Sequence, residues 1–466
     1  MINYSWQDVM KKLFRTKHIG NVHSPSELHP SLNGLDLTLL GIGAIIGAGV
    51  FVLTGIAAAT KAGPAISLSY VLAGLAALFS ALSYAELSTS VGGSGSAYNY
   101  AYTGFGEIIA WIIGWALLLE YTMSVSTVSV GWSGYVINAL EAMNIHLPSA
   151  LTKDPFSGGI VNLPAALIIG LLSYLLCVGV KHSARFNAII VAIKLITIAI
   201  FIAIASSHVD VKNWEVFFPF GFNGVAQGAA IVFFAYIGFD ALSTAAEETI
   251  NPQKNLPIGI ITSLLICTFI YVVVAILLTG VANYTTLNVP SPVAEALLHI
   301  GFKFAAAVVA VGAIAGLTTV MLVMYYGLTR ILFAISRDGL LPIFFSKVNP
   351  ETKTPTRSIL LMGVVIAIIA GFIPLSDIAE LVNIGTLTAF TFVCSGVIVI
   401  RYKHPELPRP FKLPFGPLIP LLGVLFCIYL MIHLSEATWH RFVVWMIIGL
   451  VVYFGYSRRR SLLEKI

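Results

Sequence analysis

The feature that most constrains this chain is a series of apolar runs, each long enough to cross the hydrocarbon core of a bilayer. A crossing helix needs roughly 20 mostly apolar residues. Twelve such runs lie at 37–60, 65–85, 108–138, 162–180, 186–206, 224–247, 257–282, 304–329, 358–375, 379–400, 416–434 and 442–457. Only 10% of the 466 residues are charged, against about 25% in a soluble domain. The sequence therefore predicts an all-α integral membrane protein with twelve transmembrane helices.

Basic residues predict how these runs thread through the membrane, because Lys and Arg collect on the cytoplasmic side. If the N-terminus is cytoplasmic and the runs alternate, 20 of the 26 Lys and Arg residues fall in cytoplasmic segments, five fall outside, and Lys194 lies within a span. The first residues, MINYSWQDVMKKLFRTKH, lack the apolar core of a signal peptide. We therefore predict a multi-pass protein of the plasma or inner membrane with both termini in the cytoplasm.

The polar residues exclude several classes of function. No segment between spans could hold a folded domain of about 50 residues, so any activity belongs to the helix bundle. Neither the four cysteines nor the ten histidines show metal-ligand spacing, and no phosphate-binding loop is present. We expect no metal, no cofactor, no nucleic-acid partner and no ATP-driven pumping. The basic tail at 458–460 is expected to contact anionic membrane lipids.

Several acidic residues lie near the ends of spans and are interpreted as surface or structural groups. Glu86 and Glu107 flank the segment between the second and third spans, where we expect them to be solvated. Asp240, Glu247 and Glu248 lie at the inner end of the sixth span. We interpret them as a structural or inner-gate network that pairs with Lys181, Arg185 or Arg337 in the cytoplasmic loops.

Two spans are predicted to be interrupted. The first, LTLLGIGAIIGAGVFVLTG, has glycines at 41, 43, 47 and 49, and each costs a helix interior about 1 kcal/mol against alanine. Close helix packing is the alternative interpretation, since Gly43 and Gly47 form a GxxxG pair. The sixth span is weakened around 236–238. Breaks at corresponding places in two halves of a chain indicate an inverted-repeat transporter.

Such breaks expose backbone groups that can bind a zwitterion. The N-termini of half-helices attract an anionic group, and freed carbonyls attract a cation. We expect an α-carboxylate on the amides of Gly47, Ala48 and Gly49. We expect an α-ammonium on the carbonyls of Ile45, Phe234, Ala235 and Ile237.

Three stretches together resemble one family. GIGAIIGAGVFVLTG, VFFAYIGFDALSTAAEETINPQKNLPIGI and RILFAISRDGLLP are similar to the amino acid–polyamine–organocation superfamily, and most of all to cationic amino acid transporters and their bacterial relatives. The resemblance runs from about residue 30 to the C-terminus. It implies a proton-coupled or exchange-type carrier of L-amino acids, with Phe234 as a gate over the substrate and possible binding of a small single-span accessory subunit.

The resemblance also implies a LeuT-like core of five plus five helices in inverted repeats, with broken helices one and six and two extra C-terminal helices. The segments it implies are a cytoplasmic N-terminal segment at 1–35, a first repeat at 36–210, a second repeat at 211–400, a cytoplasmic loop at 401–415, the two added helices within 416–457 and a tail at 458–466.

Lys194 is charged and lies deep within the fifth span, and a charge at membrane depth is a functional hypothesis by default. It could be structural, paired with carbonyls at a helix end. It could instead exchange a proton during transport, because burial penalises the charged form and makes both protonation states reachable. The resemblance implies that Lys194 replaces a sodium ion and bridges the first span to the hydroxyls of Thr318 or Thr319.

Glu120 is the second charge within a span. A carboxylate bonded to a nearby Tyr or Ser is the structural alternative. The functional interpretation is a counter-charge for a cationic side chain, and the resemblance groups Glu120, Ser124 and Met324 around the side-chain pocket. The sequence therefore predicts proton-coupled uptake of arginine, lysine or ornithine, with small neutral amino acids also possible.

Several other mechanisms and functions are weighed against proton-coupled uptake. Sodium coupling is disfavoured because a Lys194 ammonium would repel sodium, whereas an exchanger or a membrane amino acid sensor could use the same site. An intramembrane enzyme needs paired catalytic groups at one depth, and one acid and one lysine on different spans do not supply them. A channel needs a continuous polar pore. We therefore expect a transporter and not an enzyme.

Overall fold

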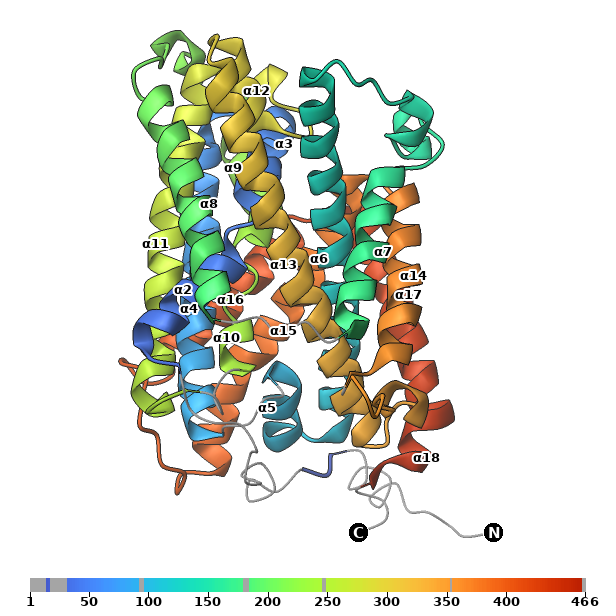
Figure 1. Ribbon diagram of the computed structural model, residues 1–466. Helices are drawn as coiled ribbons and strands as arrows, with labels where there is room; N and C mark the ends of the chain where they lie inside the picture. The colour runs from blue at the N-terminus through green and yellow to red at the C-terminus, as the bar shows by residue number, and fades with distance from the viewer. Residues whose placement is uncertain are drawn as a thin grey trace.

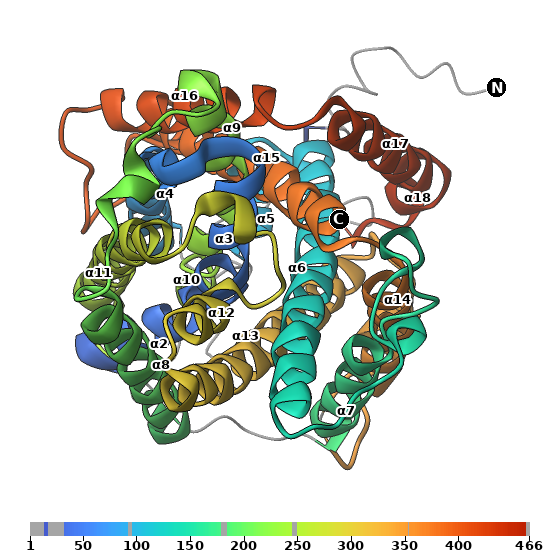
Figure 2. The same cartoon turned by 90° about the horizontal axis from the view of Figure 1, so that it is seen from above.

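The structure is a computed structural model that describes residues 14–16, 32–91, 96–178, 184–244, 249–352 and 354–462. In these ranges the regular structure is helical, and no strand occurs beyond an isolated bridge between Leu32 and Thr249. The helices stand side by side as one elongated bundle (Figure 1) and surround a central group of short segments when the bundle is seen from above (Figure 2).

The bundle is built from long helices, shorter apolar helices and short segments. The long helices are α4 (Ile66–Ser90), α6 (Glu107–Ala142), α8 (Ala184–Ala205), α11 (Pro252–Val281), α13 (Lys303–Arg337) and α15 (Leu375–Lys403). The shorter apolar helices are α7 (Leu163–Val178), α14 (Thr356–Phe372) and α16 (Leu418–Ile432), and α17 (Glu436–Val452) continues through a π-helical turn into the short segment Arg458–Arg460. The short segments are α2 (Gly34–Ile45), α3 (Thr54–Ala57), α5 (Ser96–Gly104), α9 (Gly221–Val232), α10 (Ala241–Thr244), α12 (Pro292–His299) and α18 (Arg458–Arg460).

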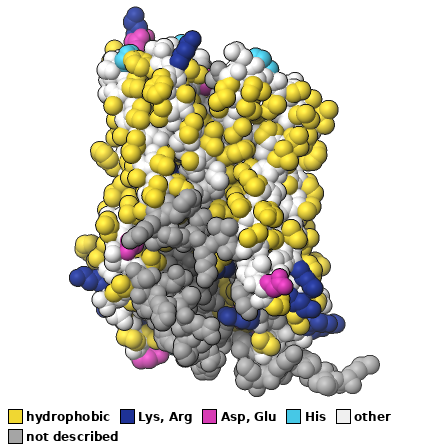
Figure 3. Space-filling model, viewed as in Figure 1, with side chains coloured by type: hydrophobic (Ala, Val, Ile, Leu, Met, Phe, Trp, Pro, Cys, Tyr) yellow, Lys and Arg dark blue, Asp and Glu magenta, His cyan; other side chains and the backbone are white. Residues whose placement is uncertain are grey.

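An all-helical membrane architecture is confirmed. In the described residues, eight helical segments are long and apolar enough to cross a membrane, and one of them, Gly34–Ser90, contains the first two predicted spans. Three shorter apolar helices coincide with the predicted spans at 162–180, 358–375 and 416–434. Apolar side chains cover the middle of the face in Figure 3, with basic side chains toward its two ends. The count of twelve crossings stays a prediction.

The predicted interruption of the first span is present. Helix α2 ends at Ile45, and Ile46 has extended backbone angles (φ −73°, ψ 106°). The chain then continues as a π-helical turn, Gly49–Leu53. A β carbon on Gly49 would lie 2.3 Å from Cα of Ala235, so this glycine also permits close packing. The first span is therefore both interrupted and closely packed in this region.

The sixth span is interrupted at the matching place. Helix α9 ends at Val232, a 3-10 turn covers Phe233–Tyr236, and Ile237 is extended (φ −65°, ψ 137°). Gly238 has φ +121°, a left-handed conformation that favours glycine. A β carbon there would lie 2.8 Å from the carbonyl oxygen of Ala44. The two breaks therefore meet in the middle of the bundle.

The first and last described segments lie at the same end of the bundle. Arg15 and Ser461 both donate hydrogen bonds to the carboxylate of Glu107 at the start of α6. We call the end of the bundle that carries Arg15, Glu107 and Ser461 the terminal face.

The expectation that Glu86 and Glu107 are solvated was wrong. Their exposed fractions are 1% and 0%, and each carboxylate bonds to arginine. Sequence position placed them between two spans, where solvent is the usual surrounding. The tertiary structure covers them with segments that are distant in the sequence, and the arginines offset the cost of burying the charge.

The closeness of the two breaks predicts the effect of a single methyl group. We expect Gly49→Ala to lower the free energy of unfolding by about 1–3 kcal/mol, because the added carbon collides with backbone atoms. The measurement is thermal unfolding in detergent. Gly170→Ala on α7 is the matched control, since its β carbon meets nothing within 4 Å. An equal melting temperature for both variants would contradict the tight crossing.

Candidate functional site

A pocket lies where the two broken spans meet. It is lined by Ala44, Ile45, Gly47, Ala48, Gly49, Ser124, Val128, Phe234, Ile237, Val320 and Met324. These residues come from the two breaks, from the middle of α6 and from α13. Eight of the residues predicted for the site therefore line one pocket, although they are spread over almost 300 positions of sequence.

The residues that open the second half of the first span line this pocket. Gly47, Ala48 and Gly49 open the second half of the span, and the first N–H groups of a helix have no acceptor within it. The carbonyl of Gly49 accepts a hydrogen bond from the hydroxyl of Tyr70 at 3.0 Å. The first break is therefore held to α4 at the carbonyl of Gly49.

The freed carbonyls have partners that sequence reasoning missed. The hydroxyl of Tyr271, on α11, lies 2.9 Å from the carbonyl oxygen of Ile45 and 3.0 Å from that of Ala235. One side chain therefore holds both breaks together. The amide of Asn383, on α15, donates to the carbonyls of Ala230 and Ile231 at 2.7 and 2.9 Å. Tyr271 and Asn383 are both polar residues inside predicted apolar spans, and this pattern was the sequence signal that could have indicated them.

The carbonyl of Phe234, which was also predicted for the site, has a partner within the second break. The carbonyl of Phe234 accepts the amide of Ile237 at 3.2 Å, which closes the 3-10 turn. The ring of Phe234 lines the pocket and is 6% exposed. Its position on the second break is compatible with the gate that the resemblance implies.

Lys194 is fully buried and bonds to the first break. Its ammonium nitrogen lies 2.7 Å from the carbonyl oxygen of Gly43 and 2.9 Å from that of Ile46. Gly316, on α13, makes room for the lysine stem, since a β carbon there would lie 2.8 Å from its Cε. These two bonds hold the end of α2 against α8.

Thr318 and Thr319 have other partners in the part of the chain described. Both hydroxyls donate to carbonyls of their own helix, and Thr318 also accepts the indole N–H of Trp132 at 3.0 Å. Lys194 reaches α13 by packing against Gly316, without a hydrogen bond to either threonine. The predicted bridge to the first span is therefore present, and its predicted extension to these hydroxyls is not.

Of the three residues expected around a substrate side chain, two line the pocket and one does not. Ser124 and Met324 line the pocket, whereas Glu120, one helical turn before Ser124, is not among the lining residues. Glu120 is 1% exposed and packs beside Gly385 of α15. Within the described residues, neither its carboxylate nor the hydroxyl of Ser124 has a hydrogen-bond partner. The pocket wall is therefore mostly apolar, with an acid buried behind it.

Among the described residues, Asp240 bonds to groups inside the bundle and not to Arg337. Its carboxylate accepts the amide of Gly238 and the hydroxyl of Tyr121, both at 3.2 Å. The left-handed turn at Gly238 brings its amide back onto this side chain. Glu247, Glu248, Lys181 and the side chain of Arg185 lie outside the described residues. The guanidinium of Arg337 lies over the ring of Phe333.

Comparisons with known proteins agree with this geometry. A family model described as amino acid permease matches residues 32–453. The methylthioribose transporter of Bacillus subtilis is 49% identical, covering 98% of this chain and 100% of the relative. The branched-chain amino acid permease BcaP of the same species is 50% identical over 97% of this chain and 99% of the relative. The vacuolar cationic amino acid transporter 4 of Arabidopsis thaliana is 39% identical, with shares of 85% and 68%.

The shared partner of the two breaks gives a direct prediction. Tyr271→Phe removes the hydroxyl and leaves two buried carbonyls without this donor, so we expect the free energy of unfolding to fall by about 1–3 kcal/mol. Thermal unfolding in detergent measures the loss. Tyr174→Phe is the control, because Tyr174 is 65% exposed on α7. Equal losses for the two variants would show that the hydroxyl does not join the breaks.

Proposed function

The chain belongs to the amino acid permease family, and on this premise we propose that it is a secondary active transporter that takes up neutral branched-chain L-amino acids by alternating access. The observation that carries the proposal is the pocket between the two breaks, which is lined by Gly47, Ala48 and Gly49 and by an apolar wall. Coupling of uptake to protons through Lys194 completes the proposal.

The backbone supports binding of the α-amino acid group. The amides of Gly47, Ala48 and Gly49 would bind the carboxylate, because a half-helix N-terminus favours an anion. The carbonyls of Ile45, Phe234, Ala235 and Ile237 would bind the ammonium group, and a carbonyl can accept a second hydrogen bond beside the one from Tyr271. Phe234 would close over the bound molecule.

The pocket wall favours an aliphatic side chain. Val128, Ile237, Val320 and Met324 supply apolar surface, and each buried methylene contributes about 0.8 kcal/mol. A cationic side chain in the same place would lose its hydration without meeting a charge on the wall. The relative BcaP is named for branched-chain amino acids, which agrees with this chemistry.

A cationic substrate is the second candidate, because of Glu120. Its carboxylate is buried one turn behind Ser124 and has no hydrogen-bond partner in the described residues. A long basic side chain that passes Ser124 could pair with it. Several relatives are named cationic amino acid transporters. A thioether sugar is a further candidate, since the methylthioribose transporter is as similar as BcaP.

Lys194 provides a physical route for proton coupling. Its protonated form bonds to the carbonyls of Gly43 and Ile46, which belong to the same break as the amides of Gly47 and Ala48. Loss of the proton would weaken these bonds and release the end of α2. We therefore propose that protonation of Lys194 and occupancy of the pocket stabilise the same closed arrangement.

The proposal includes an orientation and a repeat structure. The terminal face is assigned to the cytoplasm, because most Lys and Arg residues then lie on the cytoplasmic side. The repeats at 36–210 and 211–400 would each begin with one of the two broken spans. An exchanger or a sensor would use the same pocket, and measured net flux separates both from an uptake system.

Substrate ranking tests the proposed selectivity. In proteoliposomes we expect labelled leucine uptake to be inhibited by valine and isoleucine, and little by arginine, lysine or methylthioribose, because the pocket wall is aliphatic. Glu120→Gln should keep this ranking. Stronger inhibition by arginine that disappears in Glu120→Gln would establish the cationic candidate instead, and exclusive inhibition by methylthioribose would replace the amino acid substrate.

The response of uptake to a proton gradient tests the proposed role of Lys194 in proton coupling. With an inward proton gradient we expect leucine uptake to rise several-fold in the wild type, and Lys194→Ala to lose this response because no group then exchanges the proton. Lys303→Ala, at an exposed position that opens α13, is the control. Full pH-dependent uptake by Lys194→Ala would overturn the proposal, and a response to sodium alone would favour sodium coupling.

A further inference from the structure

Two buried carboxylates at the terminal face belong to the helices that precede and follow the short helix α5 in the chain. Glu86 is near the end of α4 and Glu107 is the first residue of α6, while α5 lies between these helices in the chain. Neither residue lines the pocket. Burying a carboxylate costs several kcal/mol unless it is paired and hydrogen-bonded, so both sites are built to hold a charge.

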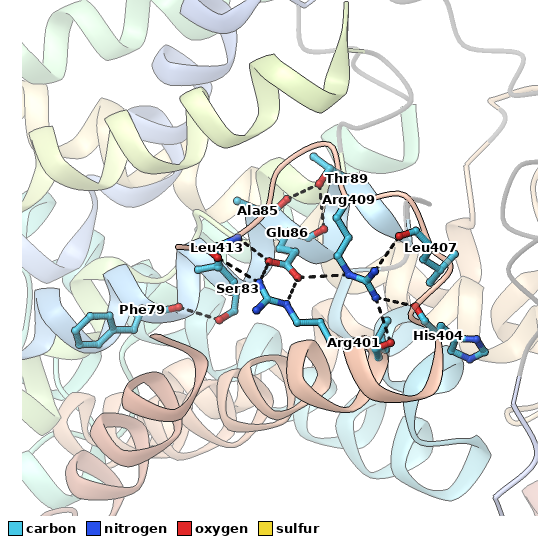
Figure 4. Close-up of polar contacts among 11 residues, drawn as sticks. Phe79, Ser83, Ala85, Glu86, Thr89, Arg401, His404, Leu407, Arg409 and Leu413 are labelled. Carbon is cyan, nitrogen blue, oxygen red and sulfur yellow. Dashed lines mark hydrogen bonds and ion pairs between the residues drawn. The ribbon is translucent and has the colours of Figure 1, made fainter. Parts of the chain in front are cut away.

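Glu86 joins α4 to α15 and to the segment that follows it (Figure 4). Arg401, near the end of α15, donates two hydrogen bonds to the two oxygens of this carboxylate, one of 2.7 Å. The amide of Leu413 donates to it at 2.8 Å, and Arg409 lies 3.9 Å away. Arg409 also bonds to the carbonyls of His404 and Leu407, which orders the segment around the pair.

Glu107 joins α6 to both ends of the chain. The guanidinium of Arg15 donates two hydrogen bonds to the carboxylate of Glu107, at 2.8 and 3.1 Å. The backbone carbonyl of Arg15 accepts a third from the backbone amide of Glu107 at 3.0 Å. Hydroxyls of Tyr102, Tyr453 and Ser461 also donate to this carboxylate. These donors come from the first described segment, from α5 and from the C-terminal segment.

Helix α5 is held between these two sites. The ammonium group of Lys403 donates to the carbonyl of Gly104 at 3.2 Å, and the hydroxyl of Tyr98 donates to Asp338, just after α13, at 2.9 Å. The ring of Tyr100 packs edge-on against that of Tyr84 on α4, with centroids 6.1 Å apart. Helix α5 lies at the lower end of the bundle in Figure 1 and near its centre in Figure 2.

The two pairs differ in the parts that they connect. Helix α4 packs extensively on α11 and α9, and α11 packs on α2, so α4 belongs with the two broken spans. The Glu86–Arg401 pair ties this group to α15, which packs on α6. The Glu107 bonds stay among α5, α6 and the chain ends. A movement of the broken spans away from α5 and α15 would therefore break the first pair and leave the second intact.

We propose that Glu86 and Arg401 are positioning residues for transport, which hold α4 against α15 and α5 while the terminal face is closed and separate when the pocket opens toward that face. Glu107 is the fixed anchor of α5 on the opposite side. The proposal rests on the transport function proposed above, and it concerns the equilibrium between closed and open forms of the terminal face.

Thiol modification tests this equilibrium without transport. The reporter is Ser124→Cys in the pocket, in a chain whose native cysteines at 177, 267, 394 and 427 are replaced by serine. A charged, membrane-impermeant methanethiosulfonate is added to each side of oriented vesicles. We expect Glu86→Gln and Arg401→Gln each to raise the rate of modification from the terminal face by about tenfold, because breaking a buried pair destabilises the closed form. We expect both to lower the rate from the other side.

Matched variants separate this role from loss of folding. Asp377→Asn breaks an exposed pair with Arg441 at the opposite end of α15, and it should leave modification from the terminal face unchanged. Arg409→Gln removes the longer contact of 3.9 Å and should give a smaller rise in a folded protein. Unchanged rates in Glu86→Gln, Arg401→Gln and Arg409→Gln overturn the proposal. If the first two variants do not fold, the rate in Arg409→Gln decides.

Substrate protection distinguishes this proposal from the proposed function. Leucine should slow modification of Ser124→Cys if the pocket binds it. If leucine gives no protection but Glu86→Gln still raises the rate from the terminal face, the substrate assignment fails and the positioning role stands. The opposite pattern, with protection by leucine and no effect of the Glu86 and Arg401 variants, leaves the transport function and removes the positioning role.

Discussion

The structure depends on how the backbone groups freed by two broken helices are satisfied inside an apolar bundle. An unbonded peptide group in hydrocarbon costs several kcal/mol, and broken helices are tolerated at this depth only where protein or a cavity supplies partners. Lys194 holds the carbonyls of Gly43 and Ile46, and Tyr271 holds those of Ile45 and Ala235. The placement of α8 and α11 against the breaks follows from these bonds.

This requirement connects the pocket to Lys194. Gly47, Ala48 and Gly49 line the pocket, and their amides are the groups proposed to bind an anionic ligand. Any ligand that bonds to them acts on the same short segment that Lys194 holds from the other side. A change at either place therefore alters the energy of the break, which is a physical basis for coupling two ligands through one bistable element.

The chain also shows how scarce charges are used in a membrane protein. Lys194 and Glu120, the two charges that the sequence placed within spans, are both buried, although only Lys194 has bonded partners among the described residues. Glu86 and Glu107 were expected in solvent because they lie between spans. Their burial depends on Arg401 and Arg15, which are 315 and 92 positions away. Local sequence contains no signal for such distant partners.

The sequence by itself determined the membrane environment, the helical class and the positions of both breaks. These properties follow from local composition, because apolar length decides insertion and closely spaced glycines weaken a helix. Only the tertiary structure decided which side chains bond to the freed backbone, that Thr318 and Thr319 do not bond to Lys194, and that Glu120 lies behind the pocket wall and not on it. The partners of Tyr271 and Asn383 were decided only there, because a hydrogen bond depends on distances between helices, and packing sets those distances.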